Sequence, residues 1–212
     1  MAKPLYLTLE FLVLFVGLPL LIFYRALPNL PIPYLLVIAL VGTLVLRYDQ
    51  SFDFDRLLST RGMGRYVPWL VLRDTAFMVL LGLAVRVFAP QLLFSLVKSS
   101  PGFWAIIMVL YPLVSVYPQE LLYRVFFFHR YRLLFGSGKA MILASACAFG
   151  FAHVIFGNWL AIVLCAIGGL LFAITYHQSG SLLLACIDHA LFGNFIFTIG
   201  LGRFFYHGTA HL

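Results

Sequence analysis

Seven long apolar runs dominate this sequence and limit the folds that it can adopt. They cover residues 5–24, 32–46, 67–95, 102–129, 140–156, 159–176 and 181–201. A helix that crosses a bilayer needs about 20 mostly apolar residues, because the hydrocarbon core is about 30 Å thick. In lipid, a helix also satisfies its own backbone hydrogen bonds. The sequence therefore predicts an all-α, polytopic membrane bundle of about seven transmembrane helices, forming a single transmembrane domain over residues 1–212.

The composition agrees with a membrane protein. Hydrophobic residues make up 63% of the chain and charged residues only 10%, whereas about 25% of residues are charged in soluble domains. The formal net charge is +7. In a membrane protein an excess of basic residues reports the orientation of the loops, so we expect a lipid bilayer and no nucleic acid among the partners.

The basic residues divide unequally between the two sets of alternate loops. One set holds Lys3, Arg47, Arg56, Arg61, Arg65, Arg130, Arg132 and Lys139, and the other holds Arg25, Lys98 and Arg203. Basic loops face the cytoplasm, which predicts a cytoplasmic N-terminus and, after an odd number of spans, a C-terminus outside, as in a bacterial inner-membrane protein. The first run is expected to persist as a helix, since no small-residue cleavage pattern follows it.

One apolar run, residues 103–128, contains both an acid and a base. An ionised side chain at the bilayer centre costs about 2.5 to 3.5 kcal/mol on insertion scales, so it persists only where it is paired, hydrated or used. Arg124 lies four residues after Glu120, on nearly the same helix face, where it can bind the carboxylate. A structural ion pair between helices would explain these two residues equally well.

Two further polar clusters interrupt apolar runs. His153 lies in the fifth run, and Asp188, His189 and Asn194 lie in the seventh. A rise of 1.5 Å per residue places Glu120 about 15 Å, His189 about 12 Å and His153 about 21 Å from the cytoplasmic ends of their helices. Because these depths bracket the middle of the bilayer, the sequence predicts one site formed by helices four, five and seven.

Such a set permits hydrolysis. A carboxylate paired with an imidazole can take a proton from water, while a second imidazole and an amide donate hydrogen bonds to the oxyanion that forms on an attacked carbonyl. Water has to reach the site, so we expect a hydrated cavity between the helices. Glu120, His153 and His189 could instead bind zinc, as in a metalloprotease. The helical H-E-x-x-H arrangement is absent, so a zinc site would need all three helices to converge.

The three motifs, taken in this order, resemble the CPBP family of intramembrane endopeptidases. The family pattern is two acids followed by three residues and Arg, then F-x-x-x-H, then His with Asn or Asp four residues later. Here these motifs look like Gln119-Glu120 with Arg124, Phe149 with His153, and Asp188-His189 with Asn194. The likeness covers about residues 100–205. It implies an endopeptidase that cleaves a peptide bond in or near the membrane.

Two positions depart from the family pattern. Gln119 stands where the family has the first acid, which is usually assigned to water activation. Asn194 follows His189 by five residues instead of four. Five residues turn a helix by about 140° and four by about 40°, so the amide reaches the site only if the helix bends or carries a π-bulge at Gly193.

The preferred hypothesis is that Glu120 has taken over the base role. It treats Glu120, His153, His189 and Asn194 as catalytic, and Gln119, Arg124 and Asp188 as supporting residues. It requires no cofactor, and a peptide or membrane protein is the expected substrate. The alternatives are a catalytically silent family member that acts as a membrane scaffold or peptide-binding protein, and a proton-coupled transporter that uses the same Glu and His residues. Glu10, Arg73 and Asp74 also lie in apolar runs and belong to no motif.

Overall fold

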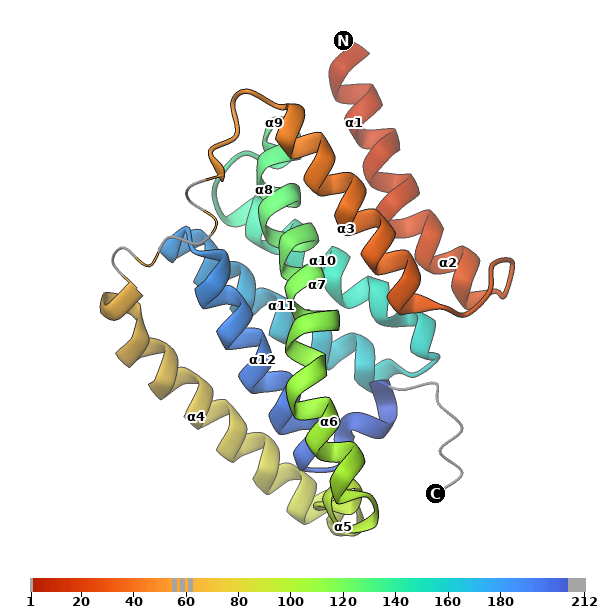
Figure 1. The fold of residues 1–212 in the computed structure, drawn as a ribbon, viewed down its shortest axis with the longest axis vertical. Coiled ribbons are helices and arrows are strands. Elements are labelled where there is room, and N and C mark those ends of the chain that lie inside the picture. Colours follow the sequence, from red (N-terminus) through yellow and green to blue (C-terminus); the bar gives the residue numbers. More distant parts are fainter. Residues whose placement is uncertain (1, 55–56, 58–59, 61–62, 206–212) are drawn as a thin grey trace.

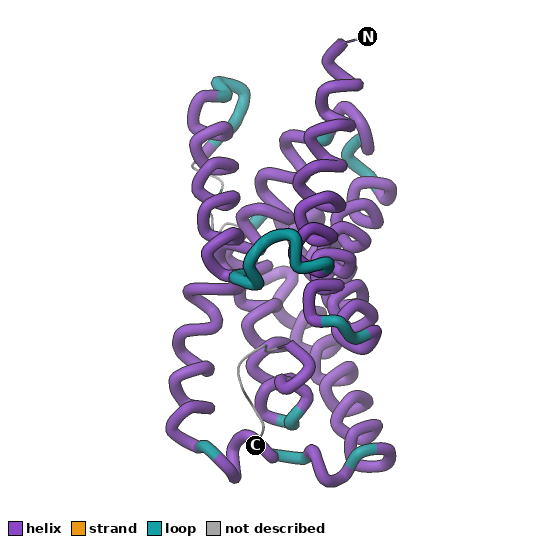
Figure 2. The backbone as a smooth tube through the Cα atoms, turned by 90° about the vertical axis from the view of Figure 1, so that its right-hand side faces the viewer, coloured by secondary structure: helices purple, strands orange, loops and turns teal. Residues whose placement is uncertain are grey.

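The computed structural model describes residues 2–54, 57, 60 and 63–205. All regular elements of the described residues are helices, which form a bundle (Figure 1) and are joined by loops and turns (Figure 2). The predicted all-α class is confirmed. Arg56 and Arg61, which contributed to the predicted orientation, lie outside the described residues.

The N-terminal half contains α1 (Ala2–Leu12), η1 (Val13–Gly17), α2 (Leu18–Phe23), α3 (Pro31–Tyr48), α4 (Met63–Phe88), η3 (Pro90–Leu92) and α5 (Ser95–Ser99). One long span then comprises α6 (Pro101–Tyr111), η4 (Pro112–Val116), α7 (Tyr117–Glu120), η5 (Leu121–Phe126) and α8 (Phe127–Arg130). The remaining elements are α9 (Arg132–Phe135), α10 (Lys139–Ala152), η6 (His153–Phe156), α11 (Trp159–Ser179), α12 (Leu182–Thr198) and η7 (Leu201–Phe205).

Each of the seven predicted runs coincides with a helix, but two of these helices differ from a straight span. By length and composition, five helices can cross a membrane, or up to six if a bent pair counts as one. In the third run, α4 ends at Phe88 and the chain turns by 113° into the segment Pro90–Ser99. Pro90 disfavours helical backbone at the preceding residue, and Ala89 is accordingly non-helical. The seventh run holds α12, which is shorter than a full span.

The long span that contains Glu120 is interrupted by two π-helical segments, η4 and η5. Pro112 and Pro118 lie in this span, and a proline removes a backbone donor from the helical ladder. The extra residue of a π-turn accommodates such a missing bond and rotates the side chains that follow it. The two π-helical segments lie on either side of α7, which carries Gln119 and Glu120.

The helices α10 and α11 pack closely against each other at two glycines. A Cβ added at Gly150 would lie 2.7 Å from the Cβ of Ala166, and one at Gly169 would lie 2.9 Å from the Phe149 ring. Side chains larger than hydrogen at these two positions would separate the helices. The two glycines therefore allow α10 and α11 to approach closely. Phe149 packs against Gly169 and lies beside both histidines of the site.

Basic residues lie at both ends of the bundle. The N-terminus and α9, with Lys3 and Arg132, lie at one end of the long axis, and α5, with Lys98, lies at the other (Figure 1). Glu10 forms an ion pair with Arg130 at 2.6 Å, which ties α1 to α8. Glu10 therefore has a structural role, and it does not line the cavity between the motif helices that is described below.

Candidate active site

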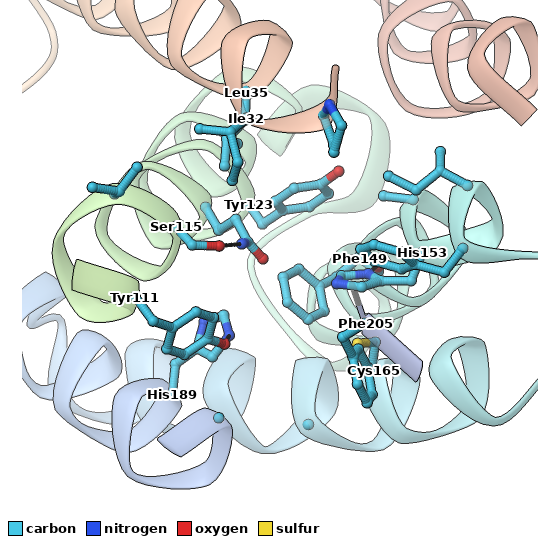
Figure 3. Close-up of a pocket in the computed structure, with 18 of the residues that line it drawn as sticks. Ile32, Leu35, Tyr111, Ser115, Tyr123, Phe149, His153, Cys165, His189 and Phe205 are labelled. Atoms are coloured by element: carbon cyan, nitrogen blue, oxygen red, sulfur yellow. Dashed lines mark hydrogen bonds between the residues drawn. The ribbon is translucent and has the colours of Figure 1, made fainter. Parts of the chain in front are cut away.

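A mostly apolar cavity of about 730 Å³ lies between the motif helices and the first three helices. Its walls include Leu18, Ile22, Leu35 and Ile38 from the N-terminal helices and Ile107 from α6. The polar side chains that line it are Asn29, Tyr34, Tyr111, Ser115, Gln119, Tyr123, His153, Cys165 and His189. Several of them converge from different helices, as Figure 3 shows. The expected cavity therefore exists, and helices that belong to no motif build one of its walls.

Glu120 and His189 are in direct contact. The Glu120 Oε1 atom lies 2.9 Å from the His189 Nδ1 atom, and the carboxylate is fully buried. His189 reaches the cavity wall, whereas Glu120 stands behind it and is not a lining residue. A carboxylate at Nδ1 fixes the orientation of the ring and stabilises its protonated form.

Arg124 neutralises the charge of Glu120. Its Nε atom lies 3.1 Å from the Glu120 Oε2 atom, within ion-pair distance but not aligned as a hydrogen bond. The Nη1 atom donates to the Ser145 hydroxyl at 2.6 Å, and this hydroxyl donates to the Tyr123 carbonyl at 2.7 Å. The guanidinium also lies over the Phe149 ring, 5.2 Å from its centroid. Arg124 is thus held in place by α10 as well as by the acid.

His153 is the first residue of η6, immediately after α10, and its ring lines the cavity. Its Nδ1 atom lies 2.7 Å from the Phe149 carbonyl oxygen. A carbonyl only accepts, so Nδ1 carries the proton and the neutral ring keeps its lone pair on Nε2. The Phe149 ring contacts both histidines, with centroid distances of 4.8 Å to His153 and 5.4 Å to His189. The structure therefore brings both imidazoles to one cavity (Figure 3).

Gln119 lines the same cavity from α7. Its Nε2 atom donates to the Ser115 hydroxyl at 2.6 Å. A carboxamide has no basic lone pair at neutral pH, so Gln119 can orient a polar group but cannot take its proton.

Asn194 and Asp188 point away from the two histidines. The helix α12 continues as α-helix through Gly193, without a π-bulge. Asn194 therefore faces α6, where its Nδ2 atom donates to the Met108 carbonyl at 3.2 Å. Asp188 accepts two bonds of 2.7 Å from Arg73 and one of 2.6 Å from Thr175. Neither residue lines the cavity.

The sequence argument missed Tyr111. This side chain comes from α6, and its hydroxyl oxygen lies 3.0 Å from the His189 Nε2 atom. It also missed Ser115, Tyr123 and Ser145, which fix Gln119 and Arg124. Hydroxyl residues in a helix carry no spacing signal of their own. The one sequence feature that could have indicated Tyr111 is Gly193, because a glycine at a motif position leaves space for a side chain from another helix.

The residues do not form a ready zinc site. Among the described residues, no group of three or more His, Cys, Asp or Glu side chains is arranged to hold a metal ion. Glu120 Oε1 is bonded to His189, and the second carboxylate oxygen faces Arg124, so neither oxygen of Glu120 is directed at a metal position shared with His153. A tetrahedral zinc site needs these ligands to converge on one point.

Residues 99–195 match the family model described as type II CAAX prenyl endopeptidase Rce1-like. This segment is Rce1-like. The match confirms the resemblance to the CPBP and CAAX protease family, and it spans every residue that the sequence assigned to the site. Together with the apolar helices it identifies a membrane protein and supports CAAX-type intramembrane protease activity. Neither a curated protein nor a solved structure matches the chain.

Proposed function

We propose that the protein is an intramembrane endopeptidase in which His153 activates water and the Glu120–His189 pair stabilises the oxyanion. The observation that carries this proposal is the arrangement of two imidazoles at one cavity within a bundle of apolar helices. One ring presents an unprotonated nitrogen, and the other is oriented by a buried carboxylate. This division supplies a base and an electrophilic partner on separate helices.

The reaction begins when a peptide carbonyl lies between the two rings. A water proton moves to the His153 Nε2 atom as the water oxygen bonds to the carbonyl carbon, and the carbonyl electrons move onto its oxygen. When the tetrahedral species collapses, the carbon–nitrogen bond breaks and His153 returns the proton to the leaving amine. The products are a carboxylic acid and an amine. No metal is needed for any of these steps.

This assignment differs from the sequence-based hypothesis on one residue. Glu120 accepts from His189 and faces Arg124, so both of its oxygens have partners and neither reaches the cavity. A base has to lie within hydrogen-bond reach of the proton that it abstracts. We therefore assign Glu120 to holding and charging His189, and assign proton abstraction to His153.

The substrate class follows from the family description and the cavity. The family is named for prenyl endopeptidases that act on CAAX peptides. The cavity is lined mainly by aliphatic and aromatic side chains, which suit an isoprenoid chain or another apolar peptide segment. We propose a lipid-modified or strongly apolar peptide as the substrate.

Cleavage of a fluorogenic peptide by the protein in proteoliposomes tests the proposal. The peptide carries a farnesylated CAAX terminus, and the same peptide without the farnesyl group serves for comparison. His153→Ala should lower kcat by about 10²- to 10⁴-fold, the usual contribution of a general base. The matched control is His177→Ala, because His177 is exposed at the end of α11. Equal rates for His153→Ala and the wild type would contradict the assignment.

A second candidate is a catalytically silent family member that binds such a peptide without cutting it. Gln119 in place of the acid and the enclosed Glu120 favour this alternative. The silent protein would bind the farnesylated peptide equally well with or without His153, and would release no product.

Metal dependence and orientation complete the proposal. Chelation with 1,10-phenanthroline should leave cleavage unchanged, because both carboxylate oxygens of Glu120 already face His189 and Arg124. We further propose an inner-membrane location with the N-terminus in the cytoplasm. Labelling of a single cysteine introduced at Lys3 or at Lys98, from each side of the membrane, would determine the orientation.

A further inference from the structure

The hydroxyl of Tyr111 lies next to His189 at the wall of the cavity. It lies 3.0 Å from the His189 Nε2 atom, and the two rings meet edge to face with centroids 6.0 Å apart. Tyr111 lines the cavity (Figure 3). An oxygen atom at the cavity wall can therefore contact the phenol and the imidazole together.

Gly193 makes this position available to Tyr111. Gly193 lies four residues after His189, one helical turn away on nearly the same face of α12. A Cβ atom there would overlap the ring and the hydroxyl of Tyr111. In the family pattern this position holds an amide or an acid, and in this chain Asn194 is turned toward Met108. A hydroxyl from α6 thus fills the space that a polar side chain from α12 would fill.

We propose that Tyr111 is a catalytic residue that donates a hydrogen bond to the oxyanion in place of the missing amide. This inference rests on the endopeptidase activity proposed above. With both nitrogens of His189 protonated, Nδ1 donates to Glu120, and the Nε2 hydrogen is shared between the Tyr111 oxygen and the substrate oxygen. The phenolic hydrogen then points to the cavity, where it meets the developing negative charge. No covalent bond to Tyr111 forms or breaks.

The chain of groups from Arg124 to Tyr111 explains why the acid can be buried. Arg124 pairs with Glu120, Glu120 holds His189, and His189 polarises the Tyr111 hydroxyl. Hydrogen bonds that involve charged groups are about twice as strong as neutral ones. A fixed donor aimed at a developing oxyanion contributes about 10²- to 10³-fold to kcat.

Three variants test the proposal in the proteoliposome assay. Tyr111→Phe keeps the ring and removes the hydroxyl, so kcat should fall about 100-fold while KM stays within about threefold. Tyr111→Ala should lose at least as much activity. Tyr111→Ala combined with Gly193→Asn returns an amide to α12 in the vacated space, and kcat should rise at least tenfold above that of Tyr111→Ala alone.

A binding measurement separates this inference from the activity on which it rests. A phosphinate peptide carries a tetrahedral anion at the cleavage site, whereas the matching ketone peptide does not. Tyr111→Phe should weaken binding of the phosphinate peptide about 100-fold, with little change for the ketone peptide. Equal weakening of both ligands, or wild-type kcat in Tyr111→Phe, would show that Tyr111 only packs beside His189. Absence of cleavage by the wild type, with the phosphinate preference absent as well, would overturn both proposals, whereas cleavage without that preference would overturn only this one.

Discussion

Two buried clusters of charge share the helix α12 and differ in what they reach. Adjacent residues of α12 belong to them, with Asp188 in one and His189 in the other. The first cluster joins Asp188 to Arg73, Asp74 and Thr175, and none of these side chains lines the cavity. In the second cluster Glu120 and Arg124 are equally buried, but the network ends in an imidazole at the cavity wall.

The comparison shows that a buried ion pair in a membrane helix does not by itself indicate a functional site. Both arginines satisfy a carboxylate that would be costly to leave unpaired in lipid. The Arg73 cluster ties α4 to α11 and α12, and its charges have no route to a substrate. Only the Glu120 cluster ends in an imidazole at the cavity wall, where it can donate a hydrogen bond to a substrate. We therefore expect mutations in the first cluster to lower stability and mutations in the second to lower activity.

The largest effect is expected from Arg73→Met. This change leaves Asp74 and Asp188, both buried, without their cation. Breaking a buried charge pair in this way costs about 3 to 5 kcal/mol of unfolding free energy. The loss can be measured by SDS titration of the protein in mixed micelles. The same substitution at the exposed Arg132 is the control and should change little. Unchanged stability of Arg73→Met would remove the distinction between the clusters.

Glu120→Gln should lower kcat by about 100-fold, since the amide holds His189 without stabilising its positive charge. Its partner Arg124 also loses its counter-ion, so the assay is best run at a temperature where both proteins remain folded. Gln119→Ala provides the comparison on the same short helix. Loss of cleavage in Gln119→Ala, with Glu120→Gln still active, would contradict the role of Glu120 and would make Gln119 the residue that orients the reacting groups.

Asn194→Ala should have the smallest effect. Its Nδ2 atom bonds a backbone carbonyl of α6, and its buried Oδ1 atom has no hydrogen-bond partner, so the substitution removes one weak bond and one unsatisfied acceptor. We expect kcat within about threefold of the wild type, because Asn194 does not line the cavity and its neutral hydrogen bond contributes only about 1 kcal/mol to stability. A 100-fold decrease would instead support the catalytic role that the sequence assigned to Asn194.

The sequence predicted the parts of the site that depend on helical spacing. Glu120 and Arg124 are four residues apart and lie within ion-pair distance, as i and i+4 positions should. The positions of His153 and His189 on separate runs also led to a shared cavity. Asn194 shows the limit of this reasoning. Its five-residue spacing was recognised as unfavourable, but the expected π-bulge at Gly193 is absent. Two π-helical segments instead flank α7, which carries Gln119 and Glu120.

Apolar run length and charge alone determined that the chain forms a helical membrane bundle, because lipid leaves few ways to satisfy a backbone. Helical periodicity likewise determined the Glu120–Arg124 pair. Tertiary structure decided which ring the carboxylate holds, which helix Asp188 binds, and that Tyr111 of α6 enters the space above Gly193. These contacts join residues 69 to 115 positions apart. They depend on the packing and rotation of whole helices, which no local pattern encodes.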